Sequence, residues 1–396
     1  MRLAEVARRL LALLLVLAAG IAQAQAPAQA PTPVEPASPR IGVVTMGPGG
    51  IFWERFGHDA IVVEDPATGA RTNYNFGFFD LEEPGFLGRF VQGRMQYMLV
   101  ALPLEQDLAY YRDVGRGATV QWLDLDPAQA RQLAADLAEN ARPENARYRY
   151  DYYTDNCATR VRDALDRALG GQLQRTLVGR SSGDTWRSES LRLASPAPWM
   201  WLAFDIGLGP RADKPLSRWQ LGFIPSRLAE GLRETRRADG RPLVAGEAVL
   251  LPQRLPPEPL GSAPRIWPWL LAGLAIAGLV LWSRSRYPRL LAAAAGLLWL
   301  ACAVLGSVLA LGWAFTDHQA MWGNRNLLLF SPLAWLLLPG AWGLLRRREP
   351  TGRFRAVLVA LAVLAALACL PLWLQVEPQR NGHWIALLLP IHAALA

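Results

Sequence analysis

Cys157 and His58 are the residue types that thiol-based nucleophilic catalysis requires, because the thiol supplies the nucleophile and the imidazole accepts and returns its proton. Each is the only residue of its kind in the first 260 positions. A cysteine that has no partner in its own domain cannot form an internal disulfide there. The pattern therefore favours a catalytic thiol over the alternative, a buried cysteine that acts only as a small apolar side chain.

The residues around Cys157 indicate the start of a helix. Asp155 and Asn156 are good N-cap residues, and the apolar spacing that follows predicts a helix over residues 158–169 that ends at Gly170. Because a helix N-terminus stabilises negative charge, we expect the pKa of the thiol to be lowered, with Arg160 adding positive charge nearby.

His58 stands directly before a predicted strand over residues 60–64, which a turn over 66–69 joins to a return strand over 71–76. A thiol–imidazole pair also needs a third group that orients the imidazole. Asn75, on the return strand, is the best candidate, and Asp59 and Asp155 are weaker ones. The alternative for His58 alone is a structural histidine at the strand end.

The chain changes character along its length. A basic start, an apolar stretch and a small-residue site predict a secretory signal over residues 1–24, and an Ala/Pro-rich tether follows over 25–40. Residues 41–260 are long enough for one mixed α+β domain, with further strands expected over 118–125 and 148–153 and a helix over 126–140.

Residues 265–396 predict an all-α transmembrane bundle of four to five helices. The spans are expected over 267–282, 290–313, 327–345 and 356–374, with a short apolar segment over 384–396. Arginines cluster after the first span and between the third and fourth, so the positive-inside rule places these loops in the cytoplasm and the soluble domain outside. The positive net charge of +8 is explained by this topology, and no basic motif indicates nucleic-acid binding.

Two further regions are candidates for contact with lipid. The segment over residues 74–97 is rich in aromatic side chains, and there Tyr97 could line an apolar surface while Arg94 meets a phosphate. The polar loop over residues 316–326 should face the soluble domain, and its His318, Asn324 and Asn326 could hold a headgroup or the second substrate. A wet interfacial loop is the alternative.

Four motifs, in order, resemble the Lnb family of bacterial membrane proteins. They are Trp-Glu-Arg-Phe-Gly-His over 53–58, Tyr-Asn-Phe-Gly-Phe-Phe-Asp over 74–80, Phe-Val-Gln-Gly-Arg-Met-Gln-Tyr over 90–97, and Tyr-Tyr-Thr-Asp-Asn-Cys-Ala-Thr-Arg over 152–160. The order of histidine before cysteine also looks like the circularly permuted, papain-related NlpC thiol fold that some phospholipid acyltransferases share. This resemblance implies that His58 and Cys157 are the catalytic pair.

The resemblance implies lipoprotein N-acylation at the bacterial inner membrane, with the catalytic domain in the periplasm. An acyl chain would pass from a phospholipid to Cys157 and then to the N-terminal amine of a diacylated lipoprotein. Asn156 and Arg160, which flank the thiol in the motif, join the expected substrate-binding residues. No cofactor is expected, and no metal-ligand spacing occurs. The rivals are a periplasmic thiol hydrolase acting on a peptide, an amide or a lipid ester, and a non-catalytic membrane receptor or scaffold.

Overall fold

The computed structural model of the chain describes residues 3–23, 37–261, 263–374 and 377–396. At the N-terminus, helix α1 (Leu3–Gln23) covers the basic and apolar parts of the predicted signal sequence and forms a unit separate from residues 38–396. The end of the predicted signal and most of the predicted tether lie outside the described residues. The cleaved signal therefore stays a prediction.

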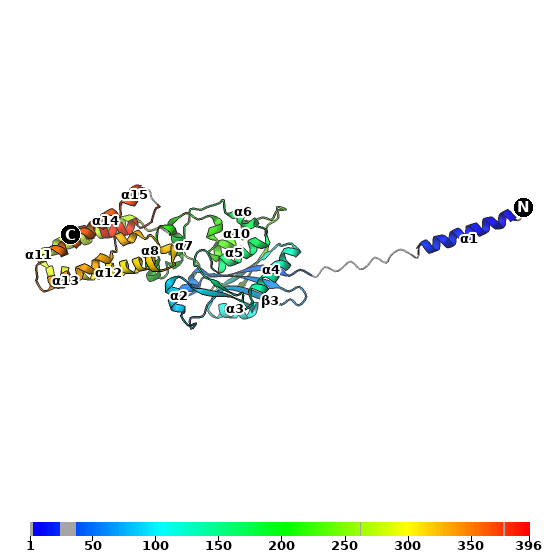
Figure 1. Ribbon diagram of the computed structural model, residues 1–396, viewed down its shortest axis with the longest axis horizontal. Helices are drawn as coiled ribbons and strands as arrows, with labels where there is room; N and C mark the ends of the chain where they lie inside the picture. The colour runs from blue at the N-terminus through cyan, green and yellow to red at the C-terminus, as the bar shows by residue number, and fades with distance from the viewer. Residues whose placement is uncertain (1–2, 24–36, 262, 375–376) are drawn as a thin grey trace. The chain divides into compact units, whose positions relative to one another are not determined.

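The extracytoplasmic part of the chain is built on a seven-stranded sheet in the order β6-β4-β3-β2-β1-β5-β7, in which all neighbouring strands are antiparallel. Figure 1 shows this sheet with helices packed against it. The strands are β1 (Arg40–Met46), β2 (His58–Glu64), β3 (Arg71–Phe78), β4 (Gln96–Pro103), β5 (Ala118–Leu123), β6 (Arg147–Arg149) and β7 (Val244–Leu251).

Helices cover both faces of the sheet because both faces are apolar. One core contains Ile61 and Tyr74 from the strands together with residues of α4 (Pro127–Asn140), α5 (Cys157–Ala168), α6 (Gln172–Leu177) and α10 (Pro225–Glu234). The opposite core packs Ala60 and Val62 against α3 (Leu104–Asp113). Alternate residues of a strand point to opposite faces, so β2 contributes to both cores.

Shorter elements complete this domain, and most of them lie between α5 and the membrane helices in the sequence. They are the 3-10 helix η1 (Phe52–Phe56), α2 (Phe86–Gln92), α7 (Trp186–Ala194), α8 (Pro198–Gly207), the 3-10 helix η2 (Pro210–Asp213) and α9 (Arg218–Leu221).

Local sequence signals correctly locate several elements. The predicted hairpin is present as β2 and β3, and α4 begins at Pro127 with a capping box made by Asp126 and Gln129. The strand expected over 148–153 is shorter, because Asp151 accepts hydrogen bonds from the backbone of Tyr153 and Thr154 and turns the chain after β6.

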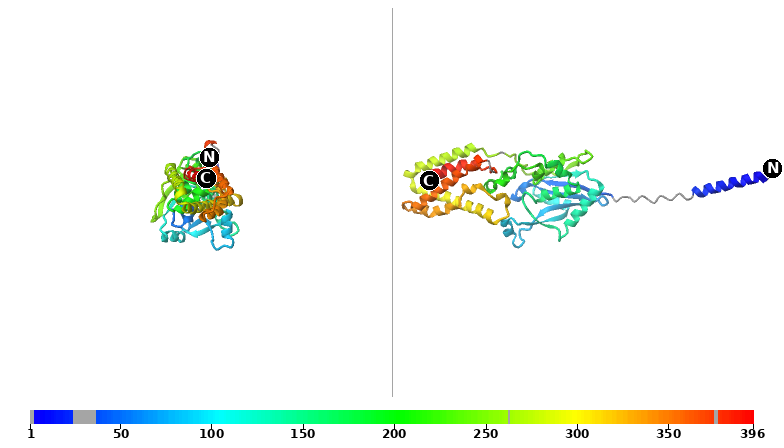
Figure 2. Two further views of the ribbon diagram at one scale, coloured as in Figure 1. Left: turned by 90° about the vertical axis from the view of Figure 1, so that its left-hand side faces the viewer. Right: turned by 45° about the horizontal axis from the view of Figure 1, so that its top comes forward.

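The C-terminal region is helical, and among its described residues three segments are long and apolar enough to cross a membrane: Ile266–Arg286 (α11), Pro288–Phe315 (α12) and Arg325–Leu345. The third is built from the 3-10 helices η4 (Arg325–Leu328) and η5 (Pro332–Leu337) and from α13 (Leu338–Leu345). The short 3-10 helix η3 (Gln319–Met321) precedes it. Figure 2 shows these helices in two further orientations.

The bundle of four to five spans expected from the sequence is therefore only partly present as long helices. The fourth expected span forms two shorter helices, α14 (Gly352–Leu367) and α15 (Leu370–Leu374), and the last segment forms α16 (Gly382–Leu395). Helix α16 is half embedded in the bundle, since Trp384, Leu388 and Ile391 are buried. The α+β class and the helical C-terminal region are confirmed, whereas the likeness to the NlpC fold stays a prediction.

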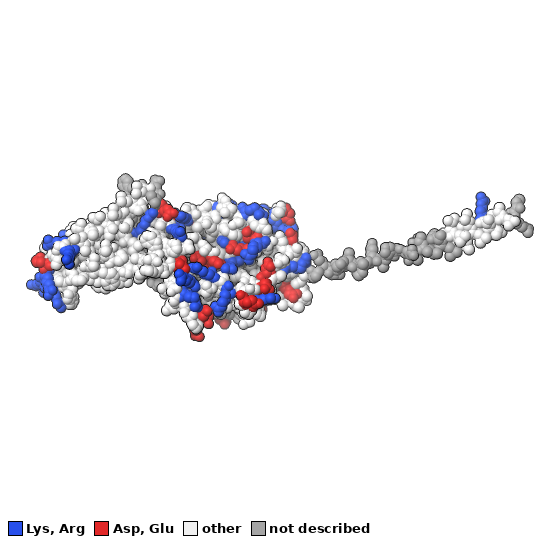
Figure 3. Space-filling view, in the orientation of Figure 1, with Lys and Arg blue, Asp and Glu red and all other residues white. Residues whose placement is uncertain are grey.

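Charge is distributed as a membrane-spanning bundle requires. In Figure 3 the flank of the bundle is almost free of charged residues, while Lys and Arg gather at the end far from the sheet domain. That end carries Arg284, Arg286, Arg289, Arg346, Arg347, Arg348, Arg353 and Arg355. The apolar flank matches a lipid environment, and the arginine-rich end is the one that the positive-inside rule assigns to the cytoplasm.

A buried polar joint connects the sheet domain to the bundle. Asp205, at the end of α8, lies 2.6 Å from Nε2 of His383 and accepts a hydrogen bond of 2.8 Å from the indole of Trp384. Arg187 donates to the Asp213 carboxylate at 2.9 Å and to the backbone oxygen of Asp205 at 2.7 Å. Since these groups are almost completely buried, the joint fixes the bundle against the sheet domain.

Candidate active site

Cys157 is the first residue of α5, and the residues before it cap this helix. The Asn156 side chain accepts a hydrogen bond of 2.9 Å from the backbone N–H of Thr159, and the Thr159 hydroxyl accepts one of 2.7 Å from the N–H of Asn156. Asn156 also donates to the backbone oxygens of Tyr152 and Phe223. These contacts use the whole side chain and favour a structural role for Asn156 over the substrate-binding role expected from the sequence.

His58 is the first residue of β2, directly after a sharp bend at Gly57. The φ angle of Gly57 is +77°, and a Cβ there would approach the Met46 carbonyl oxygen to 2.9 Å, so the bend requires glycine. Ala60 pairs with Asn75 across the sheet, which places Asn75 diagonally from His58 on the same face. Nε2 of His58 and Oδ1 of Asn75 are 3.0 Å apart.

The hydrogen bonds of Asn75 determine the tautomer of His58. The Asn75 amide nitrogen donates to Asp107 at 2.9 Å, so its oxygen faces His58 and accepts. Nε2 of His58 must then carry the proton, which leaves the lone pair on Nδ1. The imidazole is thereby prepared to act as a base through Nδ1.

Asp107 is a residue of the site that the sequence analysis missed. It lies in α3, and its carboxylate accepts from the amides of both Asn73 (2.5 Å) and Asn75. Its negative charge counteracts the effect of burial on the pKa of His58. Nothing in the local sequence marks Asp107, because the helix that carries it meets β3 only in the folded chain. Among the described residues, neither of the two weaker candidates makes a hydrogen bond with His58: Asp59 accepts from the Thr45 hydroxyl and Asp155 pairs with Arg160.

The ionisation of the thiol differs from the expectation. The N–H groups of Asp59, Ala158 and Cys157 do lower the pKa of the Cys157 thiol, as a helix N-terminus should, but burial outweighs them and raises the pKa to about 12. Burial likewise lowers the pKa of His58 below its ordinary value. At neutral pH the pair is therefore a neutral thiol and a neutral imidazole, and the predicted thiolate was wrong.

The thiol lies beside the backbone of β2, because the N–H of Asp59 is directed at the sulfur. Within the described residues no hydrogen bond joins the thiol to the imidazole of His58. Catalytic hydrogen bonds are often long in the absence of substrate and tighten when it binds. Cys157 thus lies beside the start of β2, next to the residue that follows His58, and proton transfer would require the thiol and the imidazole to come within hydrogen-bond reach when substrate binds.

A bulge in β3 lies next to Cys157. The register between β3 and β4 shifts between Phe76 and Phe78, and the intervening Gly77 has a φ angle of +99°. A methyl group added at Gly77 would lie 3.5 Å from Cβ of Cys157. Bulges commonly adjust the backbone beside active sites. Here Gly77 keeps the backbone of β3 free of a side chain at the point nearest to Cys157.

Of three other residues predicted to contact substrate, Tyr97 is buried, whereas Arg160 and His318 are partly exposed. Tyr97 stacks on Tyr150 with ring centroids 4.1 Å apart, and the guanidinium of Arg160 covers the ring of Tyr148 at 4.1 Å. Nε2 of His318, in the loop after α12, lies 3.0 Å from the backbone oxygen of Phe90.

Asn324 and Asn326 belong to the polar joint. Both amides donate to the backbone oxygen of Ile206 at the end of α8, and their oxygens accept from Gln379 and Asn381. Both residues are almost fully buried. These contacts favour a structural role for the pair over the substrate-binding role expected from the sequence.

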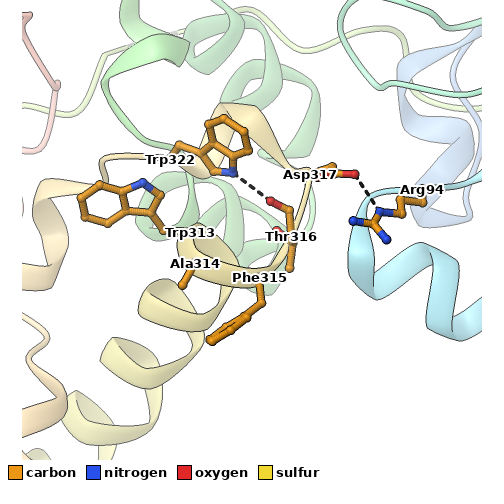
Figure 4. Close-up of a pocket in the computed structure, with 7 residues that line it drawn as sticks. All are labelled: Arg94, Trp313, Ala314, Phe315, Thr316, Asp317 and Trp322. Carbon is orange, nitrogen blue, oxygen red and sulfur yellow. Dashed lines mark hydrogen bonds and ion pairs between the residues drawn. The ribbon is translucent and has the colours of Figure 1, made fainter.

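A crevice of about 500 Å³ lies where the end of α12 meets the sheet domain. Figure 4 shows its residues, with Arg94 directed at Asp317 and the indole of Trp322 at the Thr316 oxygen. Nε of Arg94 is 2.8 Å from the Asp317 carboxylate, and Arg149 approaches the same oxygen at 2.9 Å. Two cations facing one carboxylate leave net positive charge beside the exposed rings of Trp313 and Phe315.

Comparison with protein families gives two matches in the order of the chain. Residues 29–190 match the Lnb N-terminal periplasmic domain, and residues 258–394 match the Lnb transmembrane domain. The chain belongs to the Lnb family. Both halves of the Lnb architecture are thus present, and the protein is a membrane protein with a periplasmic domain. No curated protein and no solved structure matches the chain significantly.

Proposed function

We propose that this Lnb-family protein transfers an acyl chain from a membrane phospholipid, through a thioester on Cys157, to the N-terminal amine of a diacylated lipoprotein in the inner membrane. The observation that carries the proposal is the position of Cys157 at the backbone of Asp59, directly after the His58 of the His58–Asn75–Asp107 series, in a domain joined to a membrane bundle. A thiol, a base and an orienting group together support acyl transfer through a covalent intermediate.

In the first half-reaction the thiol attacks the carbonyl carbon of the phospholipid ester. Nδ1 of His58 takes the thiol proton as the sulfur–carbon bond forms, since the thiol is neutral beforehand. Collapse of the tetrahedral intermediate breaks the ester bond, and the leaving alkoxide receives the proton from His58. The products are a lysophospholipid and an acyl thioester on Cys157.

In the second half-reaction the lipoprotein amine attacks the thioester carbonyl. His58, neutral again, accepts a proton from the amine and returns it to the sulfur as the carbon–sulfur bond breaks. The products are an amide and the free thiol, so the enzyme is restored without any cofactor. The Asn75 oxygen accepts a hydrogen bond from the Nε2–H of His58 throughout, which keeps Nδ1 directed at the reacting groups.

Exposed apolar side chains next to the site support a lipid substrate. Phe52 and Trp53 of η1, a few residues before His58, are 43% and 41% exposed, and Trp199 of α8 is 62% exposed. The rings of Phe52 and Trp199 are 6.2 Å apart, so the two elements form one apolar surface. Aromatic side chains are favoured at the membrane–water interface.

An aromatic series also connects the loop after α12 to the catalytic domain. His318 stacks on Tyr152 at 6.1 Å, Tyr152 contacts Tyr150 edge to face at 5.8 Å, and Tyr150 stacks on Tyr97. Within the proposal these rings contact the acyl chain, and Arg94 and Arg149 contact the phosphate of the headgroup.

The test is detection of the acyl-enzyme. The purified full-length protein in detergent is incubated with phosphatidylethanolamine, digested, and the peptide that contains Cys157 is examined by mass spectrometry. We expect one acyl chain on this peptide that neutral hydroxylamine removes, as it does from thioesters, and no acyl chain in Cys157→Ala or His58→Ala. Cys369→Ala, which removes a cysteine of the bundle, is the matched control and should acylate normally.

The second substrate separates transfer from hydrolysis. A synthetic diacylated lipopeptide should discharge the acyl-enzyme and appear with a third chain on its amine. Discharge at the same rate without lipopeptide, with release of free fatty acid, would contradict the proposed transferase and support a lipid hydrolase. The absence of acylation at Cys157 would contradict both.

A further inference from the structure

The hydroxyl of Tyr148 is a buried polar group that the catalytic series does not use. Tyr148 lies in β6, is 8% exposed, and its Oη makes no hydrogen bond with any residue that the structure describes. A buried hydroxyl without a partner costs free energy compared with a hydrogen-bonded one. Phenylalanine would fill the same space without this cost, so the hydroxyl calls for a functional explanation.

The hydroxyl lies next to the nucleophile. A methyl group placed on Gly77 would be 3.5 Å from Cβ of Cys157 and 3.8 Å from Oη of Tyr148. Both groups therefore lie against the position that a side chain at Gly77 would occupy. An ester carbonyl attacked by Cys157 has to occupy this neighbourhood, because the reacting carbon lies one bond from the sulfur in the intermediate.

The ring of Tyr148 is held in place independently of its hydroxyl. The guanidinium of Arg160 covers one face, the ring of Phe76 packs edge to face at 6.3 Å, and Asp155 holds Arg160 through an ion pair. A donor held in a fixed position does not need to reorganise when charge develops on the substrate. Burial also raises the pKa of the phenol well above its ordinary value, so the hydroxyl keeps its proton.

We propose that the Tyr148 hydroxyl is the oxyanion donor of this site, hydrogen-bonding the carbonyl oxygen of the acyl group in both half-reactions. As Cys157 attacks, the π electron pair of the carbonyl moves onto this oxygen, and the hydroxyl stabilises the resulting negative charge. When the pair returns, the sulfur or the alcohol leaves with the proton from His58. The inference rests on the acyl transfer proposed above.

The experiment compares two reactions of the same thiol in the full-length protein. Acylation by p-nitrophenyl butyrate passes through a tetrahedral oxyanion, and the burst of p-nitrophenolate measures its rate. Alkylation by iodoacetamide is a direct displacement at carbon and forms no oxyanion. Tyr148→Phe keeps the ring contacts with Arg160 and Phe76, and Tyr74→Phe, at another buried tyrosine of the sheet, is the matched control.

For Tyr148→Phe we expect the acylation rate to fall about 10²- to 10³-fold, as on removal of other oxyanion donors, and the alkylation rate to stay within about twofold. Thermal unfolding of this variant should occur at or above the parent temperature, because no hydrogen bond is lost. Tyr74→Phe should acylate like the parent, and Cys157→Ala should give no burst.

Two results would overturn the assignment while leaving the proposed function intact. Acylation of Tyr148→Phe at the parent rate would show that the hydroxyl does not contact the oxyanion. Equal losses in acylation and alkylation would show that it acts on the thiol instead. A parent protein without any burst at Cys157 would overturn the proposed function, and the oxyanion role with it.

Discussion

The neutral state of the Cys157 thiol leads to a quantitative prediction. Burial raises the pKa of Cys157 to about 12, compared with 9.0 for an ordinary cysteine on the same scale. At a pH below both pKa values, each unit of pKa difference changes the thiolate fraction tenfold. The folded protein should therefore hold on the order of 10³-fold less thiolate than the unfolded chain. Alkylation by iodoacetamide follows the thiolate and should be slower by a similar factor.

The assay measures alkylation of the Cys157 peptide by mass spectrometry from about pH 7 to about pH 11, in folded protein and in protein unfolded by urea. In the folded protein the rate should still rise nearly tenfold per pH unit above pH 9, where the unfolded protein levels off. Restricted access alone would lower the rate at every pH without moving the profile. Rapid alkylation that is already constant below about pH 8 would refute the reasoning, because it would reveal a stabilised thiolate.

Three further predictions concern the groups around the thiol and the polar joint. Asn75→Ala frees the imidazole of His58 to rotate and should slow acylation about 10²-fold, measured by the nitrophenyl ester burst. Burial lowers the pKa of His58, and its neutral form is the base. The acylation rate should therefore stay level above the ordinary histidine pKa near 6.5 and fall only as the pH drops below it. An acylation rate that already falls as the pH is lowered from about 8 to about 7 would contradict this. Arg187→Met leaves the buried Asp213 carboxylate unpaired and should lower stability by roughly 3–5 kcal/mol in denaturation experiments in detergent, whereas Glu247→Gln, which breaks an exposed pair, should cost less than about 1 kcal/mol.

Local signals in the sequence were sufficient for the elements that carry Cys157 and His58. The capping residues before Cys157 identify the start of α5, and the turn after Glu64 identifies the β2–β3 hairpin that brings Asn75 to His58. Hydropathy alone locates the start of the membrane region. These features depend on residues close together in the chain, so each can be recognised without the fold.

The features that were missed depend on contacts between distant residues. Asp107 reaches Asn75 from another element, and His383 meets Asp205 across 178 positions of the chain. The pKa of Cys157 was predicted in the wrong direction because the helix N-terminus is visible in the sequence, whereas the burial that outweighs it arises only in the folded protein. The hydrogen bonds of Asn324 and Asn326 could not be predicted from the sequence either, because their partner, the backbone oxygen of Ile206, lies in the distant helix α8.

The most direct test of the proposed function is the chemical state of a lipoprotein N-terminus in the cell. A reporter lipoprotein is expressed in a bacterial host that lacks its own apolipoprotein N-acyltransferase, together with this protein, its Cys157→Ala variant, or the Cys369→Ala control. Mass spectrometry of the N-terminal peptide should show an acyl chain on the amine with the parent and the control, and a free amine with Cys157→Ala. A free amine with the parent as well, when the protein is present in the membrane, would contradict the account.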